Sequence, residues 1–188
     1  MIVQTPIGRL ACEATVNGRA LSEPEALFSD KDFSPDLPPG MTVERAIAIL
    51  VSLKPATLLH DVKVRCRWLD ELPLAGDGSS GECLDAQSWI DRGKIVMVGT
   101  EDFDALQARM PHCEFLESDY PVDYQPQGFE VRIPTVPPDL ATSLHFVVAM
   151  NSWPEPVECS SWYAVDVPHR ILLALADGPS PTANPSAS

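Results

Sequence analysis

Histidine is the side chain best suited to acid–base chemistry near neutral pH, and this chain has four of them. They are widely separated, and neighbours such as His112 and Cys113 would point to opposite faces of a strand. A protein metal site needs three or four ligands that converge. The spacing therefore predicts no metal site and no cofactor. The histidines are His60, His112, His145 and His169.

The five cysteines are also scattered, and no two of them form a C-x-x-C pair. An odd number of widely spaced cysteines is typical of reduced thiols in a cytosolic protein rather than of a disulfide framework. Each cysteine lies in or near an apolar run, which favours packing in the core over nucleophilic catalysis. The cysteines are Cys12, Cys66, Cys83, Cys113 and Cys159.

Three basic residues, Lys63, Arg65 and Arg67, alternate with apolar residues along a predicted strand at 62–68. The apolar residues must face the core, because a shift of one residue would bury three cations. The basic face is a candidate anion-binding or partner-binding site. The alternative is a solvated face that neighbouring Glu and Asp residues neutralise.

The segment 101–130 carries eight acidic residues against one basic residue, Arg109, and it also contains two tyrosines. Acidic residues accelerate the encounter with a basic protein, and buried aromatic rings hold it. We therefore predict a partner-binding surface here, although a soluble face without a partner would have the same composition. The candidate contacts in this segment are Asp119, Tyr120, Asp123 and Tyr124.

A second candidate contact is the loop at 153–158, which is acidic and contains two prolines. Trp153 in this loop could anchor an interface, with Glu155 and Glu158 beside it. It could equally cover the core.

The net charge of −14 argues against a nucleic-acid binder and against docking on an anionic membrane. No signal-peptide pattern and no apolar run of transmembrane length occurs, which predicts a cytoplasmic protein. The common nucleotide, hydrolase, zinc and calcium motifs are absent. The glycine-rich segment 76–81 lacks the lysine of a phosphate-binding loop and is predicted to be a flexible surface loop.

The stretch 144–167 organises the predicted fold, because two runs rich in β-branched and aromatic residues flank a proline-containing connector. We expect two central strands there. Further strands are predicted at 9–16, 19–21, 62–68, 94–98, 112–116 and 128–133, with a strand or short helix at 171–175. Helices are predicted at 42–53, 84–91 and 101–110, and a helical turn at 23–28.

These elements predict a single α+β domain at 1–176: a mostly antiparallel or mixed sheet of about seven strands, with two or three helices packed on it. The segment 94–116 has the order of a β-α-β unit. The segment 177–188 is rich in Pro, Ser and Ala and is predicted to be a flexible tail.

The leading functional hypothesis is a non-enzymatic, acidic binding protein that neutralises a basic protein partner, as immunity proteins do with toxin domains. A second hypothesis is an enzyme or small-ligand domain in which Lys63, Arg65 and Arg67 hold an anionic substrate. His145 or His169 would then act as acid or base. A third is an accessory or structural subunit of a phage or secretion assembly.

Overall fold

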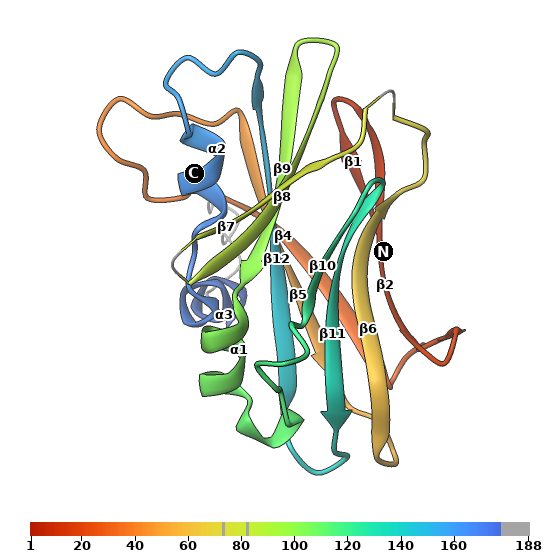
Figure 1. Cartoon of the computed structure of the whole chain (residues 1–188). Helices are drawn as coiled ribbons and strands as arrows, with labels where there is room; N and C mark the ends of the chain where they lie inside the picture. Colours follow the sequence, from red (N-terminus) through yellow and green to blue (C-terminus); the bar gives the residue numbers. More distant parts are fainter. Residues whose placement is uncertain (73, 82, 178–188) are drawn as a thin grey trace, which may run out of the picture.

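The computed structural model describes residues 1–72, 74–81 and 83–177, and it places two antiparallel β-sheets face to face (Figure 1). The first sheet has the order β1 (Ile2–Thr5), β2 (Gly8–Val16), β6 (Leu59–Trp68), β11 (Gly128–Val136) and β10 (Val122–Gln125), and β3 (Arg19–Ala20) pairs with β2. The second has the order β4 (Ala26–Phe33), β5 (Arg45–Leu53), β12 (Thr142–Ser152), β9 (Lys94–Glu101), β8 (Leu84–Asp91) and β7 (Asp77–Gly81).

The main core lies between the two sheets. Alternate residues of β6, from Val62 to Trp68, are buried there, as the sequence predicts. Phe129 of the first sheet and Phe146 of the second meet edge to face, with ring centroids 5.9 Å apart. A second apolar cluster covers the outer face of the second sheet, where the two helices nearest the C-terminal end of the described chain pack. The helices are α1 (Phe103–Arg109), the 3-10 turn η1 (Pro111–Cys113), α2 (Ser160–Val165) and α3 (His169–Asp177).

The mostly antiparallel sheet and the small number of helices confirm the coarse α+β prediction. The prediction of one sheet with about seven strands is wrong, since the described residues form two sheets with six strands each. Two stacked sheets bury their inner faces against each other, and among the helices α1 and η1 add residues such as Phe103 and Leu106 to the main core.

Two predicted helices are strands. The segment 42–53 forms β5, and 84–91 forms β8. β5 lies between β4 and β12, and β8 between β9 and β7, so both are interior strands. A strand that is covered on both faces is apolar almost throughout, as β5 is, and such a run fits helical spacing equally well. In β8 the polar residues Asp85 and Gln87 are buried, so the polar residues of this strand do not mark its exposed face.

Other predictions fail for local reasons. The expected strand at 161–167 begins with the helix α2, and 112–116 begins with the turn η1, so no β-α-β unit forms. The predicted helical turn at 23–28 and the loop after it contain the edge strand β4. The helix predicted at 101–110 is confirmed as α1. Its N-cap is Asp102, whose side chain accepts a hydrogen bond from the Ala105 amide at 2.9 Å.

The segment predicted as strand or helix at 171–175 lies within α3, which ends at Asp177. The rest of the predicted tail, 178–188, lies outside the described residues. Within the described part of the chain, no helix has both the length and the apolar character that crossing a bilayer requires.

Candidate functional site

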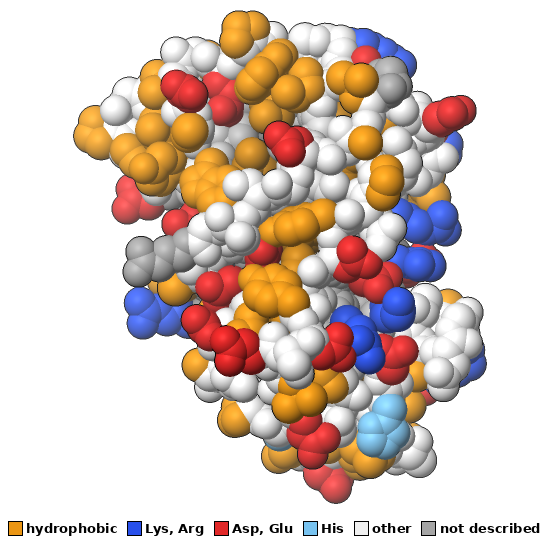
Figure 2. Space-filling model, in the orientation of Figure 1, with side chains coloured by type: hydrophobic (Ala, Val, Ile, Leu, Met, Phe, Trp, Pro, Cys, Tyr) orange, Lys and Arg blue, Asp and Glu red, His pale blue; other side chains and the backbone are white. Residues whose placement is uncertain are grey.

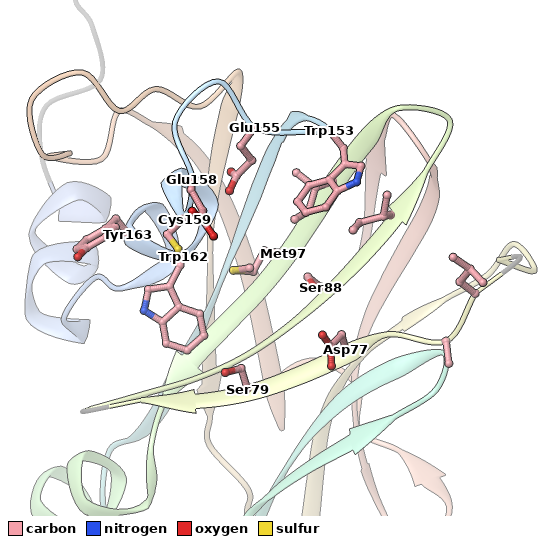
Figure 3. A pocket seen from close by; sticks show the side chains of 14 residues that line it. Asp77, Ser79, Ser88, Met97, Trp153, Glu155, Glu158, Cys159, Trp162 and Tyr163 are labelled. Atoms are coloured by element: carbon pink, nitrogen blue, oxygen red, sulfur yellow. The ribbon is translucent and has the colours of Figure 1, made fainter.

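A groove of about 790 Å³ lies on the outer face of the second sheet (Figure 3). Its floor is formed by Ser88 and Ile90 of β8 and by Ile95 and Met97 of β9. One wall is the segment before and along β7, and the other is the connector from β12 to α2 with the start of α2. We call this hollow the aromatic groove. The wall residues are Leu74, Ala75, Asp77, Ser79, Trp153, Glu155, Glu158, Cys159, Trp162 and Tyr163.

The aromatic wall remains exposed although it consists of large apolar rings. Trp153 is 45% exposed and Tyr163 is 45% exposed. Figure 3 shows Trp153 and Trp162 on opposite sides of Met97 and Ser88, while the Tyr163 ring points away from the floor. Apolar side chains gathered around a hollow are typical of an interaction site. Figure 2 shows hydrophobic side chains gathered on the upper part of the molecule with acidic side chains among them, while several basic side chains lie on the right, on the side of β6.

The connector is held in place by the Glu155 carboxylate. One oxygen, Oε1, accepts hydrogen bonds from the Ser161 amide at 2.7 Å, from the Ser161 hydroxyl at 2.6 Å and from Asn151 Nδ2 at 3.2 Å. Asn151 Nδ2 also donates to the Thr42 carbonyl at 2.8 Å. These bonds fix the wall to β12 and to α2, and they leave the second Glu155 oxygen for a ligand.

The opposite wall depends on close approach of the β7 backbone to aromatic rings. A Cβ atom at Gly81 would lie 2.8 Å from the Trp162 ring, and one at Gly78 would lie 2.6 Å from the Tyr124 ring. Glycine allows this approach because it has no side chain. The glycine-rich segment that the sequence predicts to be a loop is therefore an edge strand that supports the groove.

The groove has a negative and aromatic character. Three of its wall residues are acidic, namely Asp77, Glu155 and Glu158, and no lining residue is Lys, Arg or His. No cation of the described chain lies within ion-pair distance of these three carboxylates. Aromatic faces attract Arg and Lys, and carboxylates accept their hydrogen bonds. The arrangement can therefore bind a cationic group together with apolar surface.

The structure brings three of the seven predicted partner contacts into this groove: Trp153, Glu155 and Glu158. The other four lie elsewhere. Tyr120 and Tyr124 donate hydrogen bonds to the two oxygens of the fully buried Asp85, from Tyr120 at 2.7 Å. Tyr124 also donates to the Ser79 carbonyl at 3.0 Å.

The Asp85 contacts join the two sheets, because Tyr124 belongs to β10 and Asp85 to β8. Burial raises the pKa of Asp85 above its usual range, although the two tyrosine hydroxyls oppose this effect. Burial and the neighbouring Asp85 charge also raise the pKa of both tyrosines. The tyrosines thus bind a carboxylate of their own chain through their hydroxyl groups.

Three of the eight acidic residues in the segment 101–130, namely Glu101, Asp119 and Glu130, form ion pairs within the fold. Asp119 accepts two hydrogen bonds from Arg132, both at 2.8 Å, and Glu101 pairs with Arg109 at 2.5 Å. Asp123 is exposed and accepts from Gln125 at 2.5 Å. Asp119 and Asp123 therefore form a surface separate from the aromatic groove.

The predicted anion site on β6 is also paired. Arg65 and Arg67 each donate to Glu13 Oε1 at 2.9 Å, and Lys63 contacts Glu130 at 3.0 Å. Burial opposes ionisation of Glu13, but the two arginines outweigh it and lower the pKa of Glu13. The carboxylates supplied by β2 and β11 already occupy the basic face.

The second hypothesis requires this basic face and the histidines to converge, and the structure places them on different sheets. His145 lies on β12 of the second sheet and bonds His169 of α3, with the two Nδ1 atoms 3.0 Å apart. Burial lowers the pKa of His145 well below its usual value and lowers that of His169 to about 4, and Arg109 contributes to both shifts. Both rings are therefore neutral at pH 7.

Glu101, His145 and His169 are the described residues that could hold a metal ion, with ligand atoms within 4.8 Å of one another. The ring centroids are 5.2 Å apart and the Nδ1 atoms 3.0 Å apart, so the two nitrogens face each other almost head-on. That is the geometry of an N–H···N hydrogen bond, whereas two ligands of one ion must point to a common centre. Glu101 is also engaged by Arg109. The side chains of this cluster are therefore already bonded to each other and to Arg109.

Sequence reasoning missed Trp162, Tyr163 and Asp77 as groove residues. The two aromatic residues lie in α2, in a segment predicted to be a central strand, and Asp77 lies in the predicted loop at 76–81. The signal that could have identified Trp162 and Tyr163 is that they are adjacent aromatic residues, beginning four positions after Glu158 at the end of the acidic loop.

Comparisons of this chain with protein families, with curated proteins and with solved structures find no match.

Proposed function

We propose that this protein is a non-enzymatic binding protein that holds a basic segment of a partner protein in the aromatic groove. The observation that supports the proposal most is the combination in one groove of exposed aromatic rings with three carboxylates that have no cationic partner in the described chain. Ten acidic residues of the described chain form ion pairs with its own cations, whereas these three do not.

The energetics favour a basic segment that also carries apolar groups. A guanidinium over an exposed aromatic face contributes about 0.5–1 kcal/mol. An exposed ion pair contributes about 0.2–1 kcal/mol. The apolar floor of Ile90, Ile95 and Met97 adds burial. Several such contacts together are required for specific binding, and a segment of several residues supplies them.

The net charge of −14 supports a basic partner in a second way. A long-range negative potential accelerates association with a positive protein and repels nucleic acid. We propose a basic toxin domain as this partner, with the chain in the role of a neutralising protein. The groove supports the binding step of that role.

The test is fluorescence anisotropy with a fluorescein-labelled nona-arginine peptide. We expect the double variant Asp77→Asn, Glu158→Gln to bind about three- to tenfold more weakly, because two exposed ion pairs are lost. The matched control is Glu117→Gln, Asp139→Asn, which removes the same charge at two exposed positions outside the groove. The control should weaken binding less than about twofold.

Equal weakening by the two double variants would show that the peptide responds to net charge alone, and the groove assignment would fail. Absence of binding by the unmodified protein at low salt would contradict the proposal altogether. Raising the salt concentration should weaken binding by the unmodified protein more than binding by the groove variant.

A further inference from the structure

Cys12 and Cys66 lie directly opposite each other on the paired strands β2 and β6. Their sulfur atoms are 2.8 Å apart, and both side chains are buried in the core between the sheets. Both are free thiols in this structure. The other three cysteines lie elsewhere in the chain: Cys83 and Cys159 are exposed in turns, and Cys113 of η1 lies near Thr142.

The backbone positions satisfy what a disulfide requires. Directly opposed residues of an antiparallel pair have Cα atoms about 4.5–5.5 Å apart, which is within the range of about 4.4–6.8 Å seen in disulfides. Opposed side chains also point to the same face of the sheet. A bond length of about 2.05 Å would need the sulfurs to approach by less than about 1 Å.

We propose that Cys12 and Cys66 form a cross-strand disulfide when the chain folds in the presence of a small-molecule disulfide such as oxidised glutathione. One cysteine thiolate attacks the glutathione disulfide, forms a mixed disulfide and releases one glutathione thiolate. The second cysteine thiolate then attacks the protein sulfur of that mixed disulfide and releases the other glutathione. The two cysteines lose two protons and two electrons, and one oxidised glutathione becomes two reduced molecules.

Burial determines when this reaction occurs. Thiolates are the reacting species, and burial raises the pKa of the Cys66 thiol in the folded protein. An oxidant also has no direct path to these sulfurs, because Cys12 is 1% exposed and Cys66 is 0% exposed. The bond therefore forms while the chain folds, or when the first sheet opens, and it persists once the sheet has closed over it.

The consequence is a covalent link inside the first sheet between residues separated by 54 positions. A link that closes a loop of this length stabilises mainly by restricting the unfolded chain. The oxidised protein should melt about 5–15 °C above the reduced protein. The aromatic groove is on the second sheet, so its peptide binding should be unchanged.

The test is refolding of the denatured full chain in glutathione redox buffer, followed by trapping of free thiols and peptide mapping by mass spectrometry. We expect a peptide that joins Cys12 to Cys66, a loss of 2 Da, and the higher melting temperature. Cys12→Ala should abolish the difference in melting temperature between oxidised and reduced protein, and Cys113→Ala should retain it.

Recovery of Cys12 and Cys66 as trapped thiols after oxidative refolding would overturn the proposal. A bond from either residue to another cysteine would overturn it as well. Because reduced and oxidised samples of the unmodified protein are compared, the result does not depend on whether a variant folds.

Discussion

The outer faces of the two sheets both carry concentrated charge, but only one of them leaves that charge available. On the first sheet, Lys63, Arg65 and Arg67 contact the carboxylates of Glu13 and Glu130. On the second sheet, the carboxylates of the aromatic groove have no cationic partner in the described chain and lie beside exposed rings. A charged residue indicates a binding site only when the fold does not neutralise it.

The largest expected effect is a loss of folding stability at acidic pH, which should begin at a higher pH for groups packed on the second sheet than for those on the first. The pKa of His169 is lowered to about 4 from an ordinary value near 6.5, because burial disfavours the charged ring. The unfolded chain therefore binds the proton first, and the folded protein loses stability as pH falls from about 6.5 to about 4. The loss from His169 alone is about 3 kcal/mol.

The first sheet should respond only at lower pH. The pKa of Glu13 is lowered, so its pairing with Arg65 and Arg67 persists until pH falls below the usual Glu range. Urea unfolding at a series of pH values measures how the total free energy of unfolding changes with pH. Asp85 and Asp166, whose pKa burial raises, act in the opposite direction. The difference between unmodified protein and His169→Asn isolates the histidine, and an identical pH slope for both would refute this prediction.

Removal of one ring from the groove should have the next largest effect. Trp153→Ala should weaken nona-arginine binding about 10- to 30-fold, since truncation of a central aromatic contact costs about 2 kcal/mol. Trp153 is 45% exposed, so the folded state should lose little stability. Leu140→Ala is the matched control, because Leu140 is 50% exposed and lies outside the groove. Equal binding by the two variants, measured by anisotropy, would remove the tryptophan from the site.

The smallest effect should come from removing the ion pairs on the outer face of the first sheet. The double variant Glu13→Gln, Glu130→Gln removes the carboxylates that occupy Lys63, Arg65 and Arg67. A labelled nona-glutamate peptide should then bind about threefold to tenfold more tightly than it binds unmodified protein, through ion pairs of about 0.2–1 kcal/mol each. The variant Glu117→Gln, Asp139→Asn controls for net charge. A gain of the same size in that control would mean that pairing does not determine which charges are available.

The sequence predicts the groove in part. Trp153, Glu155 and Glu158 lie within one short loop, 153–158, so their local pattern is visible in the sequence. The strand predicted before this loop is confirmed as β12. Asp77 and Trp162 join them only through tertiary packing of β7 and α2. The spacing of residues in the sequence does not predict that packing.

The fold was predictable where one face of an element is polar. β6 alternates clearly, because its outer residues are charged and its inner residues are buried. β5 is an interior strand of the second sheet with little polar alternation, and its apolar run resembles a helix. β8 is also interior, but it buries the polar residues Asp85 and Gln87, so its polar residues do not indicate which face is exposed. The number of sheets also depends on pairings between distant segments, such as β5 with β12, which local pattern does not specify.

The most direct test of the central claim uses the four tryptophan indoles as reporters during a titration of ¹⁵N-labelled protein with nona-arginine. Trp153 and Trp162 line the groove, whereas Trp68 and Trp89 are buried in the core. Trp153→Phe and Trp162→Phe assign the two groove signals. The proposal predicts that the indole N–H signals of Trp153 and Trp162 shift with peptide concentration while those of Trp68 and Trp89 stay constant. Unchanged groove signals at a peptide concentration that saturates binding would contradict it.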